Sequence, residues 1–396
     1  MNLKKTKEIT LLIPTKNRTI FLERVLSYYK KVNFSGTLAI GDSSTGDYLI
    51  DNKKIYESMK GFISVTYQTF PEKNLCQTSH ELLKGVITEF VAEVHDDNFV
   101  IPDSINKCIK FLNNNPDYSA ARGLGVSIKT KNDEPHGKLV KCVKKEQPSS
   151  EHETASLRFQ NLYGDYSDIH YAVHRTKIYR EVLRNSHIRD NNFFHIMTTA
   201  ITFILGKVKV FDTLHLVRHI QSPVGRRVFN KNHPESNNTY WWLTSKEWNS
   251  NLTLLQESIV NSLMKIDGID KDNAQNTFEL CFFMYYSMYF GNKTYNVKEL
   301  KKYYDKYYGT ALFPRWHEAN DDMFFKILSY FYTRIRYYFE KIKNKILFRE
   351  VLNNNMLSKD TNLLLPSLLN KKSKYHKNFI PIYETIVNQP NNNIEW

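Results

Sequence analysis

The first half of the chain alternates between strand-like and helix-like segments, and no other feature of the sequence constrains the fold as strongly. Short apolar runs are separated by stretches whose apolar residues recur every three or four positions. The expected strands are 9–14, 36–42, 62–70 and 90–97, and the expected helices are 20–32, 76–89 and 101–117. This alternation predicts βαβ units, and therefore an α/β fold with a mostly parallel sheet and helices on both faces.

The chain beyond residue 117 is less regular. A polar stretch at 129–153 predicts an exposed loop, 193–206 an apolar helix and 207–220 a pair of strands. The composition changes near 222–235, and strand signals become rare after it. We therefore expect two domains, a sheet domain over 1–225 and an α-helical C-terminal region over 226–396.

Composition excludes several classes of protein. The 396 residues are 41% hydrophobic and 14% aromatic, which excludes collagen, coiled-coil and disordered chains. The four cysteines are far apart and form no CxxC pair, so neither a disulfide framework nor a structural zinc site is indicated. The sequence has no run of 18 apolar residues, so no transmembrane helix is expected. The first apolar run is too short for a signal peptide. We expect a cytoplasmic protein.

Positive charge is concentrated near the C-terminus. The net charge is +14, and residues 323–396 contain 12 Lys and Arg against 5 Asp and Glu, a surplus of half that charge. Within this region, 323–350 has the pattern of a basic amphipathic helix with an aromatic apolar side. Such a helix either packs on the protein or binds peripherally to an anionic membrane surface. Nucleic acid is not an expected partner, because no recognised nucleic-acid module accompanies the charge.

Polar residues follow three of the expected strands at the point where each strand ends. The first strand runs into Pro14, Thr15 and Arg18, the second into Asp42, and the fourth into the segment His95-Asp96-Asp97-Asn98. Ligands of parallel sheets bind at the carboxyl ends of the strands, so these loops should converge on one crevice. Each loop taken alone also fits a turn or a helix cap. Adjacent carboxylates repel unless a cation neutralises them, which favours a metal site at Asp96 and Asp97.

These motifs, in this order, resemble the nucleotide-sugar-binding segments of family-two glycosyltransferases of the GT-A fold. The resembling segments are IPTKNR, GDSSTGD and VHDDNFVIPDSI, followed by YAVHRTKIYREVL, GKVKVFDTLHLVRH and WWLTSKEWNSNL, and the similarity spans roughly residues 8–290. The later segments resemble a less characterised bacterial branch of that group. The resemblance implies a GT-A, Rossmann-like sheet and transfer of a sugar from a nucleotide-sugar.

Carried over by position, the resemblance implies roles for the strand-end residues. Pro14, Thr15 and Arg18 would border the nucleotide, and Asp42 would hydrogen-bond its base. The family's Asp-x-Asp, which holds a divalent cation on the donor diphosphate, is matched by His95-Asp96-Asp97. The chain departs from that motif at its first position, and histidine favours softer ions than Mg²⁺. The expected cofactor is nevertheless Mn²⁺ or Mg²⁺.

Later residues supply candidates for acid–base chemistry and for phosphate binding. An inverting transfer needs a base near the acceptor hydroxyl, and the resemblance suggests Asp190, which also fits an N-cap. His195 is either a second-line base or a structural residue, and His219 either a further metal ligand or an ordinary strand residue. Arg226 and Arg227 follow a glycine and suit the gripping of a diphosphate.

Three functions follow from these observations. The first is a glycosyltransferase that builds bacterial surface polysaccharide, with a nucleotide-sugar donor and a glycan or lipid-linked glycan acceptor. The second is a nucleotidyltransferase that makes nucleotide-sugars, although the Gly-rich phosphate loop usual in such enzymes is missing after the first strand. The third is a non-catalytic GT-A-fold scaffold, in which His95 and Asn98 would mark loss of activity.

Overall fold

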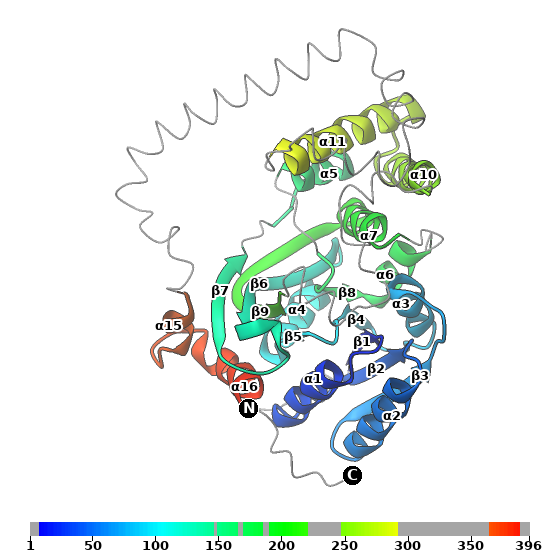
Figure 1. The fold of residues 1–396 in the computed structure, drawn as a ribbon. Coiled ribbons are helices and arrows are strands. Elements are labelled where there is room, and N and C mark those ends of the chain that lie inside the picture. The colour runs from blue at the N-terminus through cyan, green and yellow to red at the C-terminus, as the bar shows by residue number, and fades with distance from the viewer. Residues whose placement is uncertain are drawn as a thin grey trace, which may run out of the picture. The chain divides into compact units, whose positions relative to one another are not determined.

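The structure, a computed structural model, describes residues 8–145, 149–164, 169–184, 190–220, 247–291 and 364–388. They contain a nine-stranded sheet in the order β3-β2-β1-β4-β8-β6-β9-β5, with β7 paired to β6 (Figure 1). The strands are β1 (Ile9–Thr15), β2 (Thr37–Asp42), β3 (Ser64–Thr69), β4 (Phe90–Glu93), β5 (Asn98–Val100), β6 (Tyr118–Thr130), β7 (Leu139–Lys145), β8 (Val173–Arg175) and β9 (Lys207–His219).

The half of the sheet nearest the N-terminus is parallel. Strands β3, β2, β1 and β4 pair in parallel, with Thr15 opposite Asp42 and Leu12 opposite Glu93. Every described residue of β1 and β4 is buried, as expected for strands covered on both faces. The carboxyl ends of β1, β2 and β4 therefore meet at one edge, where the sequence predicted the polar loops to converge.

The other half of the sheet is mixed. Strand β8 is antiparallel to β4 and β6, and β9 is parallel to β6 but antiparallel to β5. Two expectations were wrong here. Residues 207–219 form one long strand, which stays paired with β6 along its length through several register shifts. The polar segment 129–153 is not simply an exposed loop, because Leu139–Lys145 pairs with β6 and buries Cys142. The α/β class itself is confirmed.

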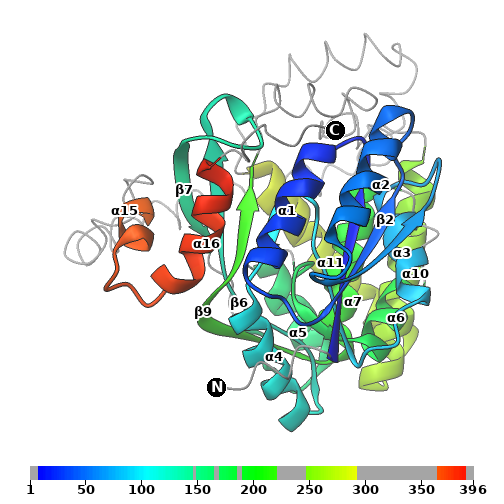
Figure 2. The same ribbon diagram turned by 90° about the horizontal axis from the view of Figure 1, so that it is seen from below.

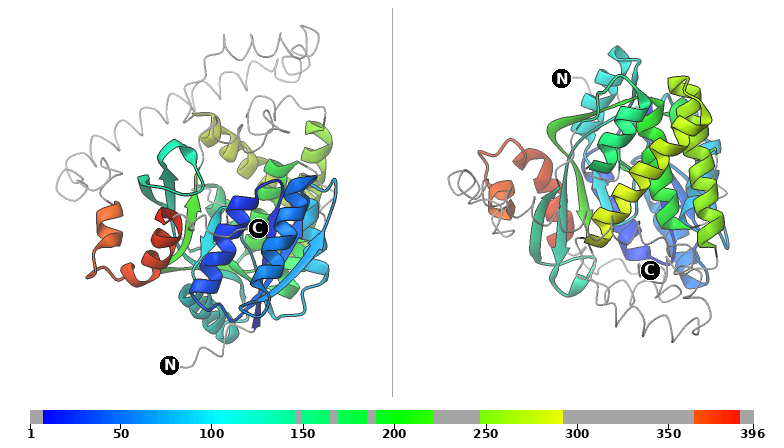
Figure 3. Two further views of the ribbon diagram at one scale, coloured as in Figure 1. Left: turned by 60° about the horizontal axis from the view of Figure 1, so that its bottom comes forward. Right: turned by 90° about the horizontal axis from the view of Figure 1, so that it is seen from above.

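Helices cover both faces of the sheet (Figure 2). On one face α1 and α2 lie side by side (Figure 3), and the core beneath them also includes Ile105, Ile109 and Phe379 from α4 and α16. On the other face α3 packs on β1 and β2, and α7 packs on α3, α6 and β6. The helices are α1 (Thr19–Lys31), α2 (Asp47–Met59), α3 (Leu75–Lys84), α4 (Pro102–Asn114), α5 (Ala155–Gly164), α6 (Thr176–Leu183), α7 (Asn191–Leu205), α10 (Trp248–Asp267), α11 (Lys271–Gly291), α15 (Leu364–Leu369) and α16 (His376–Val387).

The chain divides into two compact units. One comprises Met1–Pro234, Asn249–Cys281 and Asn362–Trp396, and the other comprises Glu235–Trp248 and Phe282–Thr361. Beyond residue 220 the described elements are all helices, as predicted, whereas the predicted boundary after residue 225 stays a prediction. The amphipathic segment 323–350 lies outside the described residues. Among the helices that are described, none has the length and apolar character needed to cross a bilayer.

Candidate functional site

The loops after β1 and β2 are joined by hydrogen bonds. Ser43 N donates to the carbonyl oxygen of Thr15 at 2.9 Å, and Asn17 N donates to Ser44 Oγ at 2.7 Å. Asn17 has a positive φ of 53°, which asparagine tolerates better than most residues, and its Oδ1 accepts from Thr45 N. The two loops therefore form one rigid rim at the carboxyl edge of the parallel strands.

Asp42, the last residue of β2, lies beneath this rim. Its carboxylate is fully buried and accepts hydrogen bonds from Ser44 N (2.7 Å), Asn52 Nδ2 (2.9 Å) and the Tyr67 hydroxyl (2.6 Å). These contacts give Asp42 a role in holding the β2 loop. The hydrogen bond from Asp42 to a nucleotide base stays a prediction, as does the placement of Pro14, a buried residue of β1, beside the nucleotide.

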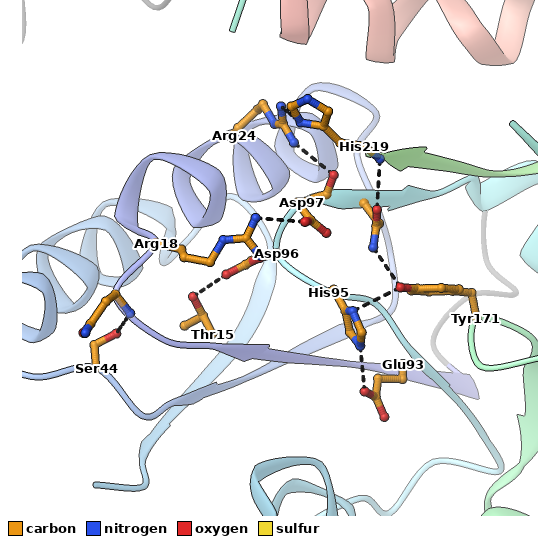
Figure 4. A network of polar contacts seen from close by, with 12 residues as sticks. Thr15, Arg18, Arg24, Ser44, Glu93, His95, Asp96, Asp97, Tyr171 and His219 are labelled. Carbon is orange, nitrogen blue, oxygen red and sulfur yellow. Dashed lines mark hydrogen bonds and ion pairs between the residues drawn. The ribbon is translucent and has the colours of Figure 1, made fainter. Parts of the chain in front are cut away.

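The turn after β4 places two carboxylates against a residue of the β1 loop. Arg18 Nη1 lies 2.9 Å from Asp96 Oδ1, and Arg18 Nη2 lies 2.8 Å from Asp97 Oδ2 (Figure 4). Thr15 Oγ1 donates to Asp96 Oδ2 at 2.7 Å. The side chains of Arg18, Asp96 and Asp97 are 14%, 3% and 15% exposed, so this ion-pair cluster is largely shielded from water. The structure thus brings together four of the predicted site residues: Thr15, Arg18, Asp96 and Asp97.

The two carboxylates differ electrostatically although they are adjacent. Burial acts to raise the pKa of Asp97, but the charge and hydrogen bond of Arg18, together with His95 and His219, outweigh burial and lower that pKa. Burial and the negative charge of Asp97 raise the pKa of Asp96 in spite of Arg18. Burial alone would lower the pKa of Arg18, and the two carboxylates raise it instead. Arg18 therefore stays a cation at any ordinary pH, and Asp97 stays an anion.

These carboxylates fit a hard divalent cation by their chemistry. Carboxylate oxygens suit Mg²⁺ and Mn²⁺. Both oxygens of Asp96 are already engaged, by Arg18 and by Thr15. Asp97 uses only Oδ2 for Arg18, and within the described part of the chain no hydrogen bond reaches its Oδ1. Asp97 is therefore the residue that can offer an oxygen to a cation without losing its contact with Arg18.

A second buried guanidinium, which the sequence analysis missed, supports this turn from behind. Arg24 of α1 is 1% exposed, and its Nη2 donates to the carbonyl oxygen of Asp97 at 2.9 Å. It also donates to the carbonyl oxygen of Pro135 and lies over the rings of Phe21 and Phe99. Burial lowers the pKa of Arg24 to about 9. A lone arginine on the apolar side of the predicted helix 20–32 was the available signal.

His219 lies at the end of β9 beside Arg24. Its Nδ1 is 3.2 Å from Arg24 Nη1, and its Nε2 is 3.1 Å from Thr130 Oγ1. Burial, and then the charge of Arg24, lower the pKa of His219 to about 3, so the ring is neutral. Its backbone N donates to Asn98 Oδ1, which ties β9 to the turn after β4. Both ring nitrogens face protein partners here, and a role for His219 as a metal ligand stays a prediction.

His95 turns away from Asp96 and Asp97. Its Nε2 lies 3.1 Å from Glu93 Oε1 and its Nδ1 lies 3.0 Å from the Tyr171 hydroxyl (Figure 4). Among the residues that the structure describes, one group of three or more potential ligands gathers within 4.8 Å, and it consists of Glu93, His95 and His170. Glu93 and His170 were not predicted. The signal for Glu93 was a charged residue inside the apolar run FVAEV.

Asp190 and His195 lie at the start of α7. Asp190 Oδ1 accepts a hydrogen bond from Phe193 N at 2.8 Å, which is the N-cap that was weighed against the catalytic role. The ring of His195 lies 4.3 Å from that of His170 and 6.2 Å from that of His95, measured between centroids. These contacts do not test whether Asp190 or His195 acts as the catalytic base. Arg226 and Arg227 lie outside the residues that the structure describes.

Comparison with known proteins returns structural similarity alone. No protein-family model matches the chain, and no curated protein does. Solved structures of S. aureus TarS are similar at low identity. The TarS 1–349 structure is 12% identical with a TM-score of 0.38, covering 73% of this chain and 93% of that one.

Two further TarS structures are similar to the chain to a comparable degree. The complex of TarS 1–349 with UDP-GlcNAc is 11% identical with a TM-score of 0.37, covering 72% of this chain and 92% of that one. A longer TarS structure is 13% identical with a TM-score of 0.35 and covers 64% of this chain. The match spans only 43% of the longer TarS chain.

Proposed function

We propose that the chain is a glycosyltransferase that moves a sugar from a nucleotide-sugar to a hydroxyl of a glycan or lipid-linked glycan. The reaction would take place at one site, at the carboxyl edge of β1, β2 and β4. One observation carries the proposal: a buried Arg18–Asp96–Asp97 cluster lies where the ends of parallel strands meet. Ligands of α/β sheets bind at that edge. The sequence resemblance to GT-A glycosyltransferases adds the reaction class.

The cluster suits the departure of a nucleoside diphosphate. Negative charge grows on the diphosphate as the glycosidic bond breaks, and fixed positive charge stabilises it. Arg18 is a permanent cation held in place by two carboxylates, and Asp97 Oδ1 is the oxygen assigned to a divalent cation. A bound Mg²⁺ or Mn²⁺ would supply further positive charge to the phosphate oxygens. Arg226 and Arg227 are assigned to the same anion on their sequence alone.

Asp190 is assigned the role of base in an inverting transfer. It would accept the proton of the acceptor hydroxyl, with His195 one turn along α7 as a second candidate. Domain 1–225 would contain the donor site apart from Arg226 and Arg227, which follow it directly. The segment 323–350 would bring the enzyme to the cytoplasmic face of an anionic membrane, an assignment that rests on its basic amphipathic sequence.

The first test is a thermal-shift panel of nucleoside diphosphates and nucleotide-sugars, each with Mn²⁺, Mg²⁺ or EDTA. A ligand at about 100 times its Kd adds about 2.7 kcal/mol of stability. We expect a cation-dependent shift with one nucleotide, which Asp97→Asn abolishes. Transfer should fall at least about 100-fold in that variant, beyond what loss of a supporting partner costs. Asp51→Asn, an acid-to-amide change on an exposed part of α2, is the matched control.

Each other result has a definite meaning. A nucleotide shift that ignores EDTA removes the cation from the proposal and leaves Arg18 to neutralise the leaving group. No shift with any nucleotide rejects the transferase and favours the scaffold. Release of pyrophosphate from a nucleoside triphosphate favours the nucleotidyltransferase instead.

A further inference from the structure

A second polar cluster lies directly below the turn that carries Asp96 and Asp97. Its centre is Glu93, the last residue of β4, which is fully buried. The Nε2 atoms of His95 and His170 each lie 3.1 Å from the same oxygen, Glu93 Oε1. His170 is 1% exposed, whereas the side chain of His95 is 19% exposed, the largest exposed fraction of the three.

The spacing of these atoms matches that of ligands around a small transition-metal ion. Zinc binds histidine nitrogen and carboxylate oxygen at about 2.0–2.2 Å in a tetrahedral arrangement. Ligand atoms on such a tetrahedron are about 3.3–3.5 Å apart, by the geometry of those bond lengths. The separations of 3.1 Å from Glu93 Oε1 to the two nitrogens differ from this by only a few tenths of an ångström. All three ligand atoms lie within 4.8 Å of one another, so small rotations of the side chains would place them around one ion.

Outer hydrogen bonds hold the three side chains in this orientation. The Tyr171 hydroxyl lies 3.0 Å from His95 Nδ1, which directs the opposite nitrogen of the ring at Glu93. The Tyr179 hydroxyl donates to Glu93 Oε2 at 3.0 Å and leaves Oε1 toward the imidazoles. Partners of this kind around metal ligands set the tautomer of the histidine and the direction of the carboxylate.

Charge also favours a cation at this position. The carboxylate of Glu93 is fully buried at the end of β4. A buried carboxylate needs a counter-ion. In the described part of the chain, the basic groups within ion-pair distance of Glu93 are His95 and His170, with no lysine or arginine among them. A metal ion held between the two imidazoles and the carboxylate would supply that positive charge.

The geometry points to a transition-metal site formed by Glu93, His95 and His170, separate from the hard-cation position at Asp97. Two imidazoles and one carboxylate suit Zn²⁺, whereas Mg²⁺ prefers oxygen ligands. The ring of His195 lies 4.3 Å from that of His170, between centroids, so α7 places a further imidazole beside the cluster. A bound ion would tie the end of β4 to the segment before β8, and so brace the turn that carries Asp96 and Asp97.

Co²⁺ binding to the metal-depleted full-length protein tests the site, because tetrahedral Co²⁺ has intense visible d–d bands. We expect one equivalent of Co²⁺ to produce these bands and Zn²⁺ to displace it, whereas Mg²⁺ does not. Glu93→Gln and His170→Gln should each weaken binding by at least about 100-fold. Asp97→Asn should leave the bands unchanged, which distinguishes this site from the donor cation.

Two controls show whether a loss of Co²⁺ binding comes from the ligands or from misfolding. His95→Gln changes the most exposed of the three ligands and should also abolish the bands, with the far-UV circular dichroism unchanged. X-ray absorption at the zinc edge of the unmodified protein should show two imidazole ligands and needs no variant. The inference is wrong if the wild-type protein binds no Co²⁺ stoichiometrically, or if the bands persist in folded His95→Gln. Neither result depends on sugar transfer.

Discussion

Two carboxylate clusters lie within five residues of each other at the end of β4, and they are neutralised in different ways. Asp96 and Asp97 are paired with the guanidinium of Arg18, whereas Glu93 is paired with the imidazoles of His95 and His170. A guanidinium is a permanent cation that competes with a metal for the carboxylates. An imidazole becomes a metal ligand once it loses its proton. The first cluster is therefore suited to anions and hard cations, and the second to transition metals.

The largest expected effect comes from removing the permanent cation. Arg18→Gln leaves Asp96 and Asp97 as two uncompensated, largely buried carboxylates, and breaking a buried ion pair costs about 3–5 kcal/mol. Urea unfolding at pH 7 should show this loss, and added Mn²⁺ should recover part of it. Lys84→Gln, which breaks an exposed ion pair with Glu81, should leave stability nearly unchanged. Equal stabilities of the two variants would contradict the buried role of Arg18.

His215 is a buried histidine that, unlike His95 and His170, has no carboxylate as its hydrogen-bond partner, and it shows what burial alone does to an imidazole. His215 is fully buried between Ser104 Oγ and the Tyr171 carbonyl, both at 2.8 Å, and burial lowers its pKa from 6.5 to about 3. The unfolded chain thus binds a proton near pH 6.5 and the folded chain only near pH 3. Stability is therefore lost as the pH falls between these values, by about 2 kcal/mol at pH 5 for this histidine.

The matching variant is His215→Gln. In this variant the difference in unfolding free energy between pH 7 and pH 5 should shrink by about 2 kcal/mol, because the histidine that takes up a proton on unfolding is gone. The same substitution at His152, an exposed position, is the control. An unchanged pH dependence in His215→Gln would show that the folded protein binds this proton near the ordinary pKa of histidine.

Tyr171 connects the Glu93 cluster to the strand β5. Its hydroxyl accepts a hydrogen bond from Asn98 Nδ2 at 2.9 Å and lies 3.0 Å from His95 Nδ1. Tyr171→Phe should cost about 1 kcal/mol of stability and weaken Co²⁺ binding about tenfold, because His95 loses its orienting partner. Tyr29→Phe removes another buried hydroxyl, bonded to the Val100 carbonyl, and should leave Co²⁺ affinity unchanged. Equal Co²⁺ affinities in the two variants would separate Tyr171 from the metal site.

The smallest change in stability is expected at Arg24. This guanidinium contacts carbonyl oxygens and His219, and in the described part of the chain no carboxylate pairs with it. Arg24→Met removes both a costly buried charge and its hydrogen bonds, so stability should change by less than about 1 kcal/mol. Nucleotide affinity should still fall about tenfold, because the Asp97 turn loses its support. A loss above about 3 kcal/mol would show that Arg24 holds the fold together.

Local patterns in the sequence were sufficient for the parallel half of the sheet. The alternation over residues 9–117 placed β1 to β4 and the helices α1, α3 and α4, because burial on both faces produces apolar runs and helix packing produces a 3.6-residue period. It did not predict α2. The mixed half was harder. Strand β6 contains two glycines and an arginine, and β7 is rich in lysine, so neither has the composition of a buried strand. Their place follows from pairing with β9 and with each other.

By itself the sequence determined that Arg18, Asp42, Asp96 and Asp97 would lie at one edge, since parallel neighbours end at the same edge. Only the tertiary structure decided which charges pair. Glu93 and His170 are 77 positions apart and meet because β8 runs antiparallel to β4. That pairing turns His95 toward Glu93 and leaves Asp97 to Arg18. Contacts of this range depend on strand order, which the local periodicity of a chain does not record.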